Sequence, residues 1–182
     1  MVLYSELKDD YKIVSTVMKT QGKVDGVMVN TKDWKVSGLM IKPGWLKKNV
    51  LIKMDQIDSV DVLEKTITVS AEVDKEEVPV DAKADKKNVP LVSNELNANV
   101  DDVLIGKMAI SSDGQEIGKI YDFDTPMKLD KWLVWKVLVK TGFKSRRIRV
   151  SSSDITGIGE TVTLKQTKKE MEHQSKKESE EE

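Results

Sequence analysis

All the arginines of the chain lie within one short segment, as Arg146, Arg147 and Arg149, and Lys140 and Lys144 come just before them. Guanidinium groups bind carboxylates and phosphates through paired N–H donors. The segment therefore indicates docking of an acidic protein partner or contact with RNA phosphates. The alternative is a solvated hairpin, whose cations would discourage edge-to-edge pairing of strands.

Two aromatic side chains occupy matching places beside these cations. Trp45 and Phe143 each follow a glycine in a predicted hairpin turn, and Lys47 and Lys48 flank Trp45 as Lys144 flanks Phe143. Glycine allows a tight turn, so the next residue would project from the hairpin tip. The two tips predict a docking surface for an acidic and apolar partner, including a second copy of the chain. The alternative is that each ring folds back over its own barrel as a plug.

A second aromatic candidate is Trp135, three residues after Trp132. Side chains alternate between the faces of a strand, so residues three apart point to opposite faces. We therefore expect one of the two rings to lie outside the core. An exposed Trp is typical of an interface, although a neighbouring barrel could also cover it.

Composition removes most kinds of enzyme. The chain has no cysteine, and His173 is its one histidine and lies in a charged tail. Thiolate catalysis, a Ser-His-Asp triad in the folded body and a multi-histidine metal site are thereby excluded. Carboxylates are frequent in one region, at Asp101, Asp102, Asp122, Asp124 and Asp130. Their spacing does not match a calcium-binding loop, and we expect no catalytic residue, no metal and no cofactor.

Charge and hydropathy point away from nucleic acid and membranes. The 182 residues carry a net charge of -1, whereas a basic excess marks most RNA binders. No apolar run approaches the ~18 residues that span a bilayer. The first ten residues lack the basic and apolar regions of a signal peptide. We expect a cytoplasmic protein without direct membrane insertion.

The sequence repeats itself with a constant offset. Trp34 and the alternating apolar residues after it return 98 positions later, from Trp132. The same offset carries Ile57 onto Ile155. Upstream, an offset of 93 places Val24 and Val27 on Ile117 and Ile120, and a later offset of 95 places the 66–69 strand on 161–164. The chain therefore contains two copies of one unit.

Each copy is a series of short strands. The second copy predicts strands over 104–110, 115–123, 132–139, 148–150 and 161–164, with one helical turn starting at 152–155 and a bulge or close approach at Gly118. Strands of this number and spacing predict an all-β chain of two small tandem barrels. We divide the chain into a first barrel over 1–70, a partly packed linker over 71–99, a second barrel over 100–165, and a charged tail, helical or disordered, over 166–182.

The second copy resembles the PRC-barrel family. The resemblance rests on Gly114, on Ile117-Gly118-Lys119-Ile120-Tyr121-Asp122, on Trp132, and on an ending through Asp154-Ile155 and Ile158-Gly159 to Thr161-Val162-Thr163-Leu164. The first copy keeps the apolar positions. It departs at Lys23-Val24-Asp25-Gly26-Val27 and carries Asp61 where the second has Gly159. The two matches cover about residues 9–70 and 101–165.

The resemblance implies a docking and assembly module and no catalysis. Some tandem PRC barrels resemble adaptors of archaeal cell division, which work with the membrane anchor of the tubulin-like ring protein. The expected function is thus a non-enzymatic adaptor that forms a homodimer or heterodimer and is recruited to the division site. Its interface would use Trp45, Phe143, Trp135, Lys47, Lys48, Lys144, Arg146, Arg147 and Arg149. The alternative is an RNA- or ribosome-associated maturation factor, because another branch of the family has that role.

Overall fold

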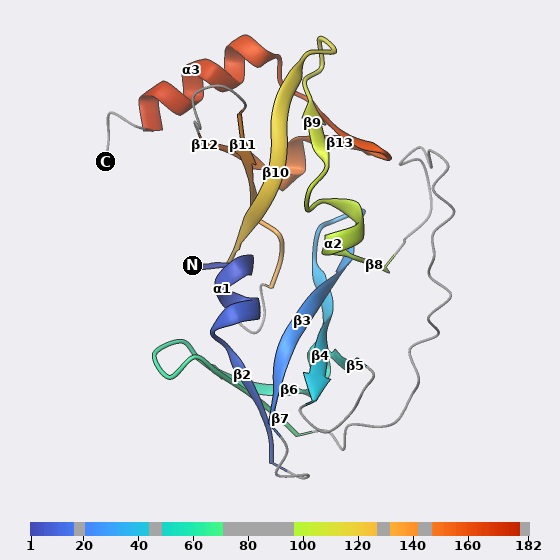
Figure 1. The fold of residues 1–182 in the computed structure, drawn as a ribbon, viewed down its shortest axis with the longest axis vertical. Coiled ribbons are helices and arrows are strands. Elements are labelled where there is room, and N and C mark those ends of the chain that lie inside the picture. Colours follow the sequence, from blue (N-terminus) through green and yellow to red (C-terminus); the bar gives the residue numbers. More distant parts are fainter. Residues whose placement is uncertain (17–20, 44–48, 71–96, 127–131, 142–146, 179–182) are drawn as a thin grey trace.

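The computed structural model describes residues 1–16, 21–43, 49–70, 97–126, 132–141 and 147–178. This part of the chain is mostly β, as the alternation of apolar residues predicts. Two sheets are stacked along the longest axis of the molecule, and the N-terminus lies about midway between the two ends (Figure 1).

We call the sheets A and B. Sheet A contains β1 (Val2–Leu3), β9 (Met108–Ile110), β10 (Glu116–Thr125), β11 (Lys136–Lys140), β12 (Arg147–Ser151), β13 (Ile155–Ile158) and β14 (Thr161–Leu164). Sheet B contains β2 (Lys12–Ser15), β3 (Gln21–Asn30), β4 (Val36–Pro43), β5 (Val50–Lys53), β6 (Ile57–Asp61), β7 (Thr66–Val69) and β8 (Asn97–Asn99).

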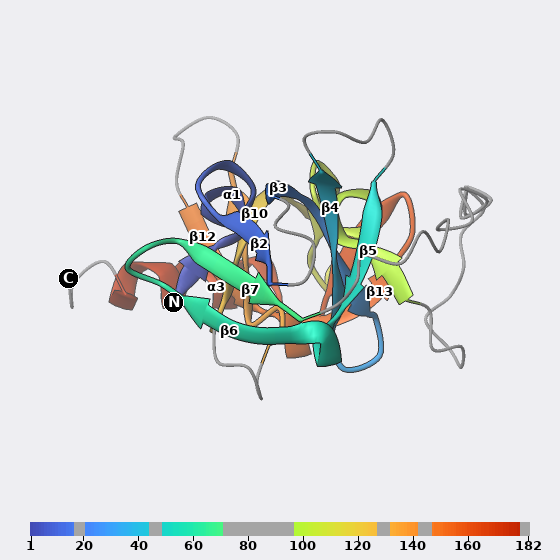
Figure 2. The same cartoon turned by 90° about the horizontal axis from the view of Figure 1, so that it is seen from below.

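The strands follow the same order in both sheets, β12-β11-β10-β9-β14-β13 in A and β5-β4-β3-β2-β7-β6 in B. In each sheet one pair is parallel, β9 with β14 and β2 with β7, and the other neighbours are antiparallel. Figure 2, seen from below, shows that sheet B is curled: β6 and β7 turn away from β4 and β5. The repeated sequence therefore builds one strand arrangement twice.

The hydrogen-bond register corrects one part of the sequence alignment. Ile41 pairs with Val24 in sheet B, and Val139, 98 positions after Ile41, pairs with Ile120 in sheet A. Val24 thus corresponds to Ile120 and Val27 to Phe123, so the offset of β3 to β10 is 96 and the predicted 93 is wrong. The apolar residues here recur every three positions, so a slip of three positions matches apolar on apolar equally well.

Each sheet also receives a short strand from the other half of the sequence. β1, at the start of the chain, pairs with the end of β10. β8, which comes just before the second copy, pairs with the end of β3. Helix α1 (Tyr4–Asp9) follows β1 and leads to β2 in sheet B. Helix α2 (Val100–Val103) follows β8 and leads to β9 in sheet A. The two copies therefore exchange their leading segments.

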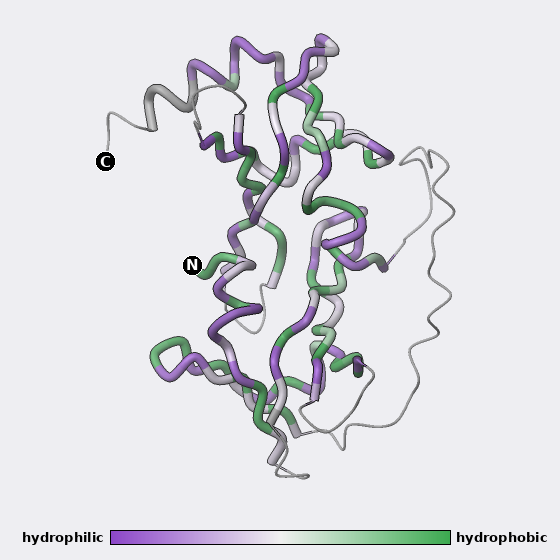
Figure 3. The backbone as a smooth tube through the Cα atoms, in the orientation of Figure 1, coloured by the Kyte–Doolittle hydropathy of each residue, from purple (hydrophilic) through white to green (hydrophobic). Residues whose placement is uncertain are grey.

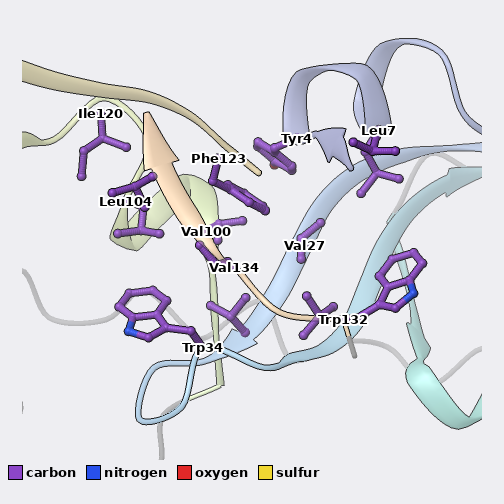
Figure 4. Close-up of a cluster of buried hydrophobic side chains, with 14 of the residues drawn as sticks. Tyr4, Leu7, Val27, Trp34, Val100, Leu104, Ile120, Phe123, Trp132 and Val134 are labelled. Carbon is purple, nitrogen blue, oxygen red and sulfur yellow. The ribbon is translucent and has the colours of Figure 1, made fainter. Parts of the chain in front are cut away.

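The centre of the molecule has the same reciprocal form. Val36 N–H donates to the Trp132 carbonyl and Val134 N–H donates to the Trp34 carbonyl, both at 2.9 Å, and Lys35 and Leu133 form a bridge between them. Both Trp side chains are buried. In Figure 4 the Trp34 ring lies on the side of Leu104 and Ile120, and the Trp132 ring lies on the side of Leu7 and Val27. We call these exchanged segments and paired Trp residues the clasp.

Trp34 adopts φ 60°, a left-handed conformation that is uncommon for a bulky residue. Its N–H donates to the Asn30 carbonyl at 2.8 Å, and the residue is only 5% exposed. Strained backbone persists where the surroundings over-determine it. The burial of the ring and the hydrogen bonds of the backbone at both ends supply that constraint.

Several local predictions for the second copy are confirmed. A 3-10 turn (η2, Ser152–Asp154) lies where one helical turn was predicted. At Gly118 the register shifts, and a Cβ there would overlap the Lys140 carbonyl oxygen, so this close approach requires glycine. The predicted 104–110 strand is wrong in its first part, because Leu104 ends α2 and only Met108–Ile110 is extended.

The tail forms a helix, α3 (Lys168–Glu178). Thr167 begins it as in a capping box, since its N–H and hydroxyl both donate to the Glu170 carboxylate at 2.8 Å. Met171, the one large apolar residue of the tail, is completely buried. Of the two predictions for the tail, helix or disorder, helix is correct over this range.

Candidate docking surfaces

Two of the predicted interface arginines are described, and both lie on β12. Arg147 and Arg149 are two residues apart, so they share one face of this edge strand, and both are exposed. Arg149 approaches Asp124 of β10, with 3.8 Å between its Nε and the carboxylate Oδ2. Burial raises the pKa of the Asp124 carboxyl, and Arg149 acts in the opposite direction. Arg149 is therefore partly engaged within sheet A, and Arg147 lies at the start of β12.

Trp135 lies at the other end of the same region. It immediately precedes β11, and 42% of its surface is exposed. Trp135 N–H donates to the Asp124 carbonyl and its own carbonyl accepts from Ser152 N–H, both at 2.9 Å, so the backbone is fixed. The Lys136 ammonium lies 5.5 Å from the ring centroid. Of the two Trp residues three apart, Trp132 is inside and Trp135 is the exposed one, so one ring lies outside the core as expected.

The predicted patch is not one compact site. Lys140 pairs with Arg147, so Trp135 and Arg147 are separated by the length of β11, roughly 17 Å at about 3.4 Å per residue. The remaining predicted interface residues lie outside the described residues: Trp45, Lys47, Lys48, Phe143, Lys144 and Arg146. The hypothesis that aromatic tips act in docking therefore stays a prediction.

The register of the strands brings together cations that lie far apart in the sequence. In sheet A, Lys119, Lys140 and Arg147 are direct neighbours across β10, β11 and β12. In sheet B, Lys12, Lys23 and Lys42 are direct neighbours across β2, β3 and β4. All six side chains are exposed. We call these two sets the cation rows.

A further surface feature is the tip of the β6–β7 hairpin in sheet B, which sequence reasoning missed. Val62 is 49% and Leu63 is 94% exposed. Figure 3 shows this tip in the hydrophobic colour, where the hairpin projects from the body. The signal was present in the sequence as an apolar pair within a turn, between Asp61 and Glu64, whereas a turn is usually polar.

The tip has a defined geometry. Asp61 Oδ1 accepts the N–H groups of Leu63 and Glu64, both at 2.9 Å, and Lys65 takes φ 49°. Lys65 also pairs with Asp10 at 2.5 Å. The turn thus holds Val62 and Leu63 at a fixed place in solvent.

The predicted acidic cluster has a structural role in the clasp. Asp122 accepts Ser5 N–H, the Ser5 hydroxyl and Phe123 N–H, so it holds the first turn of α1. Asp101 accepts the Tyr4 hydroxyl at 2.7 Å and pairs with Lys8 at 3.0 Å. Burial, with help from Asp101, raises the pKa of the Tyr4 hydroxyl far above its ordinary value, so Tyr4 remains a donor. Asp130 lies outside the described residues.

No helix of the described part of the chain is both long enough and apolar enough to cross a bilayer. Comparison of the sequence with protein-family models and with curated proteins finds no match.

Proposed function

We propose that the chain is a non-enzymatic adaptor that docks proteins and associates with itself. The observation that carries this proposal is the exposure of Leu63, 94%, and of Trp135, 42%, on a frame that buries most of its other large apolar side chains. A solvent-exposed Leu or Trp loses favourable burial, which is worth about 1.5–3 kcal/mol for a Leu-sized side chain. Burial in a partner recovers it.

The way these side chains are held supports docking. The hydrogen bonds of Asp61 fix the hairpin tip, and two backbone hydrogen bonds fix Trp135. Preorganised groups lose less conformational entropy when they bind. The two features belong to different sheets, so one chain offers two separate contact points, as an adaptor requires.

The resemblance to PRC barrels supports a more specific form of this proposal. In that form each curled sheet is a PRC-type barrel, the source is archaeal, and the chain is recruited from the cytoplasm to the division site. The partner would be a second PRC-barrel chain or the membrane anchor of the tubulin-like ring. The Gly118 close approach and the repeated strand order agree with a barrel motif present twice.

Sedimentation equilibrium of the full chain over a wide concentration range tests the proposal. We expect concentration-dependent association that Leu63→Ser or Trp135→Ala weakens, with the melting temperature unchanged. Glu160→Ser is the matched control, because Glu160 lies at the corresponding hairpin tip of sheet A. A chain that stays monomeric and also fails to bind the purified ring anchor from the same organism would contradict the adaptor function.

The second candidate is RNA binding, which the exposed cations of β12 and of the two cation rows favour. RNA affinity falls steeply with salt, because each phosphate contact releases counterions. Apolar docking through Leu63 and Trp135 depends much less on salt. Binding of an RNA oligonucleotide measured across a salt series therefore separates the two functions.

A further inference from the structure

The two cation rows are an unfavourable arrangement for the fold itself. Direct cross-strand neighbours lie about 4.5–5.5 Å apart at Cβ, and like charges at that distance are destabilising. Among the described residues, none of the six cations takes part in an ion pair. Each row therefore repels itself in the free protein, and an anionic partner would relieve this repulsion.

The rows share two of their three positions and a common location. Lys23 and Lys119 correspond at the offset of 96, and Lys42 and Lys140 at the offset of 98. The third cation differs, since it comes from β2 in sheet B and from β12 in sheet A. The row of sheet B lies near the start of β3, and the row of sheet A lies near the start of β10. These two strand starts lie toward opposite ends of the long axis (Figure 1).

The spacing of a row matches one kind of acidic partner. Three adjacent strands span two gaps, or about 9.6 Å in total. Carboxylates at positions i, i+4 and i+7 of an α-helix span about 10.5 Å. An extended peptide that presents every second residue spans about 13 Å over three side chains. A helix that crosses the strands at right angles therefore places three carboxylates over three cations, and an extended strand does not.

We propose that each cation row binds an acidic face of a partner helix, so that one chain holds two such helices at its opposite ends. This inference rests on the proposed docking function and names the chemistry of its partner. The carboxylates would accept hydrogen bonds from Lys119, Lys140 and Arg147 at one end and from Lys12, Lys23 and Lys42 at the other. Charge complementarity is the argument for the occupant.

An acidic helix fits these rows better than a nucleic acid does. The chain has a net charge of -1, and each row supplies only three cations. In sheet A the same face carries the buried carboxylates Asp122 and Asp124 further along β10, where α1 covers it. A phosphate backbone that continued beyond the row would meet these carboxylates and α1.

The probe is a labelled alanine-based helical peptide with glutamates at i, i+4 and i+7. Calorimetry with the full chain should show two peptides bound per chain. Replacing all three cations of either row by Gln should leave one site, and the lost site should be weakened by about tenfold or more, which corresponds to about 1.4 kcal/mol. A triple Gln variant of Lys53, Lys165 and Lys169, which are exposed and outside the rows, is the control of equal net charge.

Three results would overturn the inference. The first is equal binding of a peptide of the same composition with its glutamates spread around the helix. The second is equal loss of binding in the control variant. The third is tighter, row-dependent binding of a single-stranded RNA oligonucleotide, which would assign the rows to nucleic acid.

Self-association of the row variants tests the docking function separately from peptide binding. If the peptide fails to bind and Leu63→Ser still weakens self-association, only the assigned partner is wrong. If the chain also remains monomeric and does not bind the ring anchor, the proposed function is wrong as well.

Discussion

Sheets A and B share their strand order and most of their register, yet they secure their exchanged helices differently. In sheet A, Asp122 holds α1 from the opposite half of the chain. The corresponding position in sheet B is Gly26, and α2 is capped from its own side by Asn99, whose Oδ1 accepts Asp101 N–H at 3.1 Å. The stacked Tyr4 and Phe123 rings, 4.7 Å apart, likewise correspond to two valines, Val100 and Val27.

The surfaces differ as well. The β6–β7 hairpin ends in Val62-Leu63, whereas the β13–β14 hairpin of sheet A has Gly159-Glu160 at its tip. The backbone frame is thus kept in both copies, while the contacts at the clasp and at the hairpin tips have diverged. Mutual packing therefore constrains the frame, and the exposed positions are where the two halves are free to take separate roles.

The largest expected effect is at the paired Trp residues. Trp34→Ala and Trp132→Ala should each lower the free energy of unfolding by about 3–5 kcal/mol, as for other buried aromatics. Because each ring lies in the opposite half, either change should destabilise both sheets in one transition. Denaturant unfolding followed by far-UV circular dichroism measures this, with Trp135→Ala as the control. A loss confined to one sheet in hydrogen exchange would show that the halves are independent.

The next effect concerns the helix contacts that differ between the sheets. Asp122→Ala leaves the Ser5 N–H without its acceptor and should cost about 1–3 kcal/mol. Asn99→Ala removes a local cap and should cost about 1 kcal/mol. Chemical denaturation of the two variants compares them. Equal costs would mean that capping from the opposite half adds nothing to the clasp.

A smaller effect of opposite sign is expected in the cation rows. Lys140→Gln and Lys23→Gln each remove the central charge of a row, which should raise the free energy of unfolding by about 0.2–1 kcal/mol. High salt should reduce the gain, because it screens exposed charges. Thermal melts at low and high salt measure this, and a gain that persists at high salt would rule out charge repulsion as its cause.

The smallest effect is expected at Asp124. Its pKa is raised by burial, so the folded state holds the proton more tightly than the unfolded state does. Stability of the parent chain therefore falls as pH rises through the interval between the unfolded and folded pKa. As pH rises through that interval, the free energy of unfolding of Asp124→Asn should increase relative to that of the parent. Loss of the Arg149 contact reduces this gain.

Asp113 is a control for this prediction, because its pKa is shifted in the opposite direction. Its pKa is lowered, first of all by the hydrogen bond with Ser111, so Asp113→Asn should lose stability near neutral pH and approach the parent as pH falls. Melting temperatures across acidic to neutral pH compare the two variants. Parallel pH profiles for both would contradict these assignments.

The sequence predicted the β class, the duplication and that one of Trp132 and Trp135 lies outside the core, because these depend on local alternation and on long matching offsets. It did not predict the exchange of β1 and β8. A strand of two or three residues has no periodicity of its own, and its partner lies about a hundred residues away. The slip from 96 to 93 has a similar cause, since apolar residues three apart match in either register.

The candidate surfaces were predictable to different degrees. The shared face of Arg147 and Arg149 follows from alternation within one segment. The exposure of Trp135 does not, because strict alternation places Trp135 on the face of Val137 and Val139, which are completely buried. The cation rows could not be found without the register, because Lys12, Lys23 and Lys42 are neighbours only once three strands are paired. Leu63 was missed because an apolar residue in a turn is normally expected to pack back onto the body.

The exchange of leading strands also governs the order in which the chain can fold as it is made. Val2 and Leu3 pair with Thr125 and Asp124, so after they are synthesised they wait for about 120 more residues. At about 5–20 residues per second this wait is on the order of ten seconds. Sheet B likewise stays incomplete until Asn97–Asn99 emerges. A chain that stops at the end of the first copy would therefore expose the edges that its second copy normally covers, and it would be a substrate for chaperones and proteases.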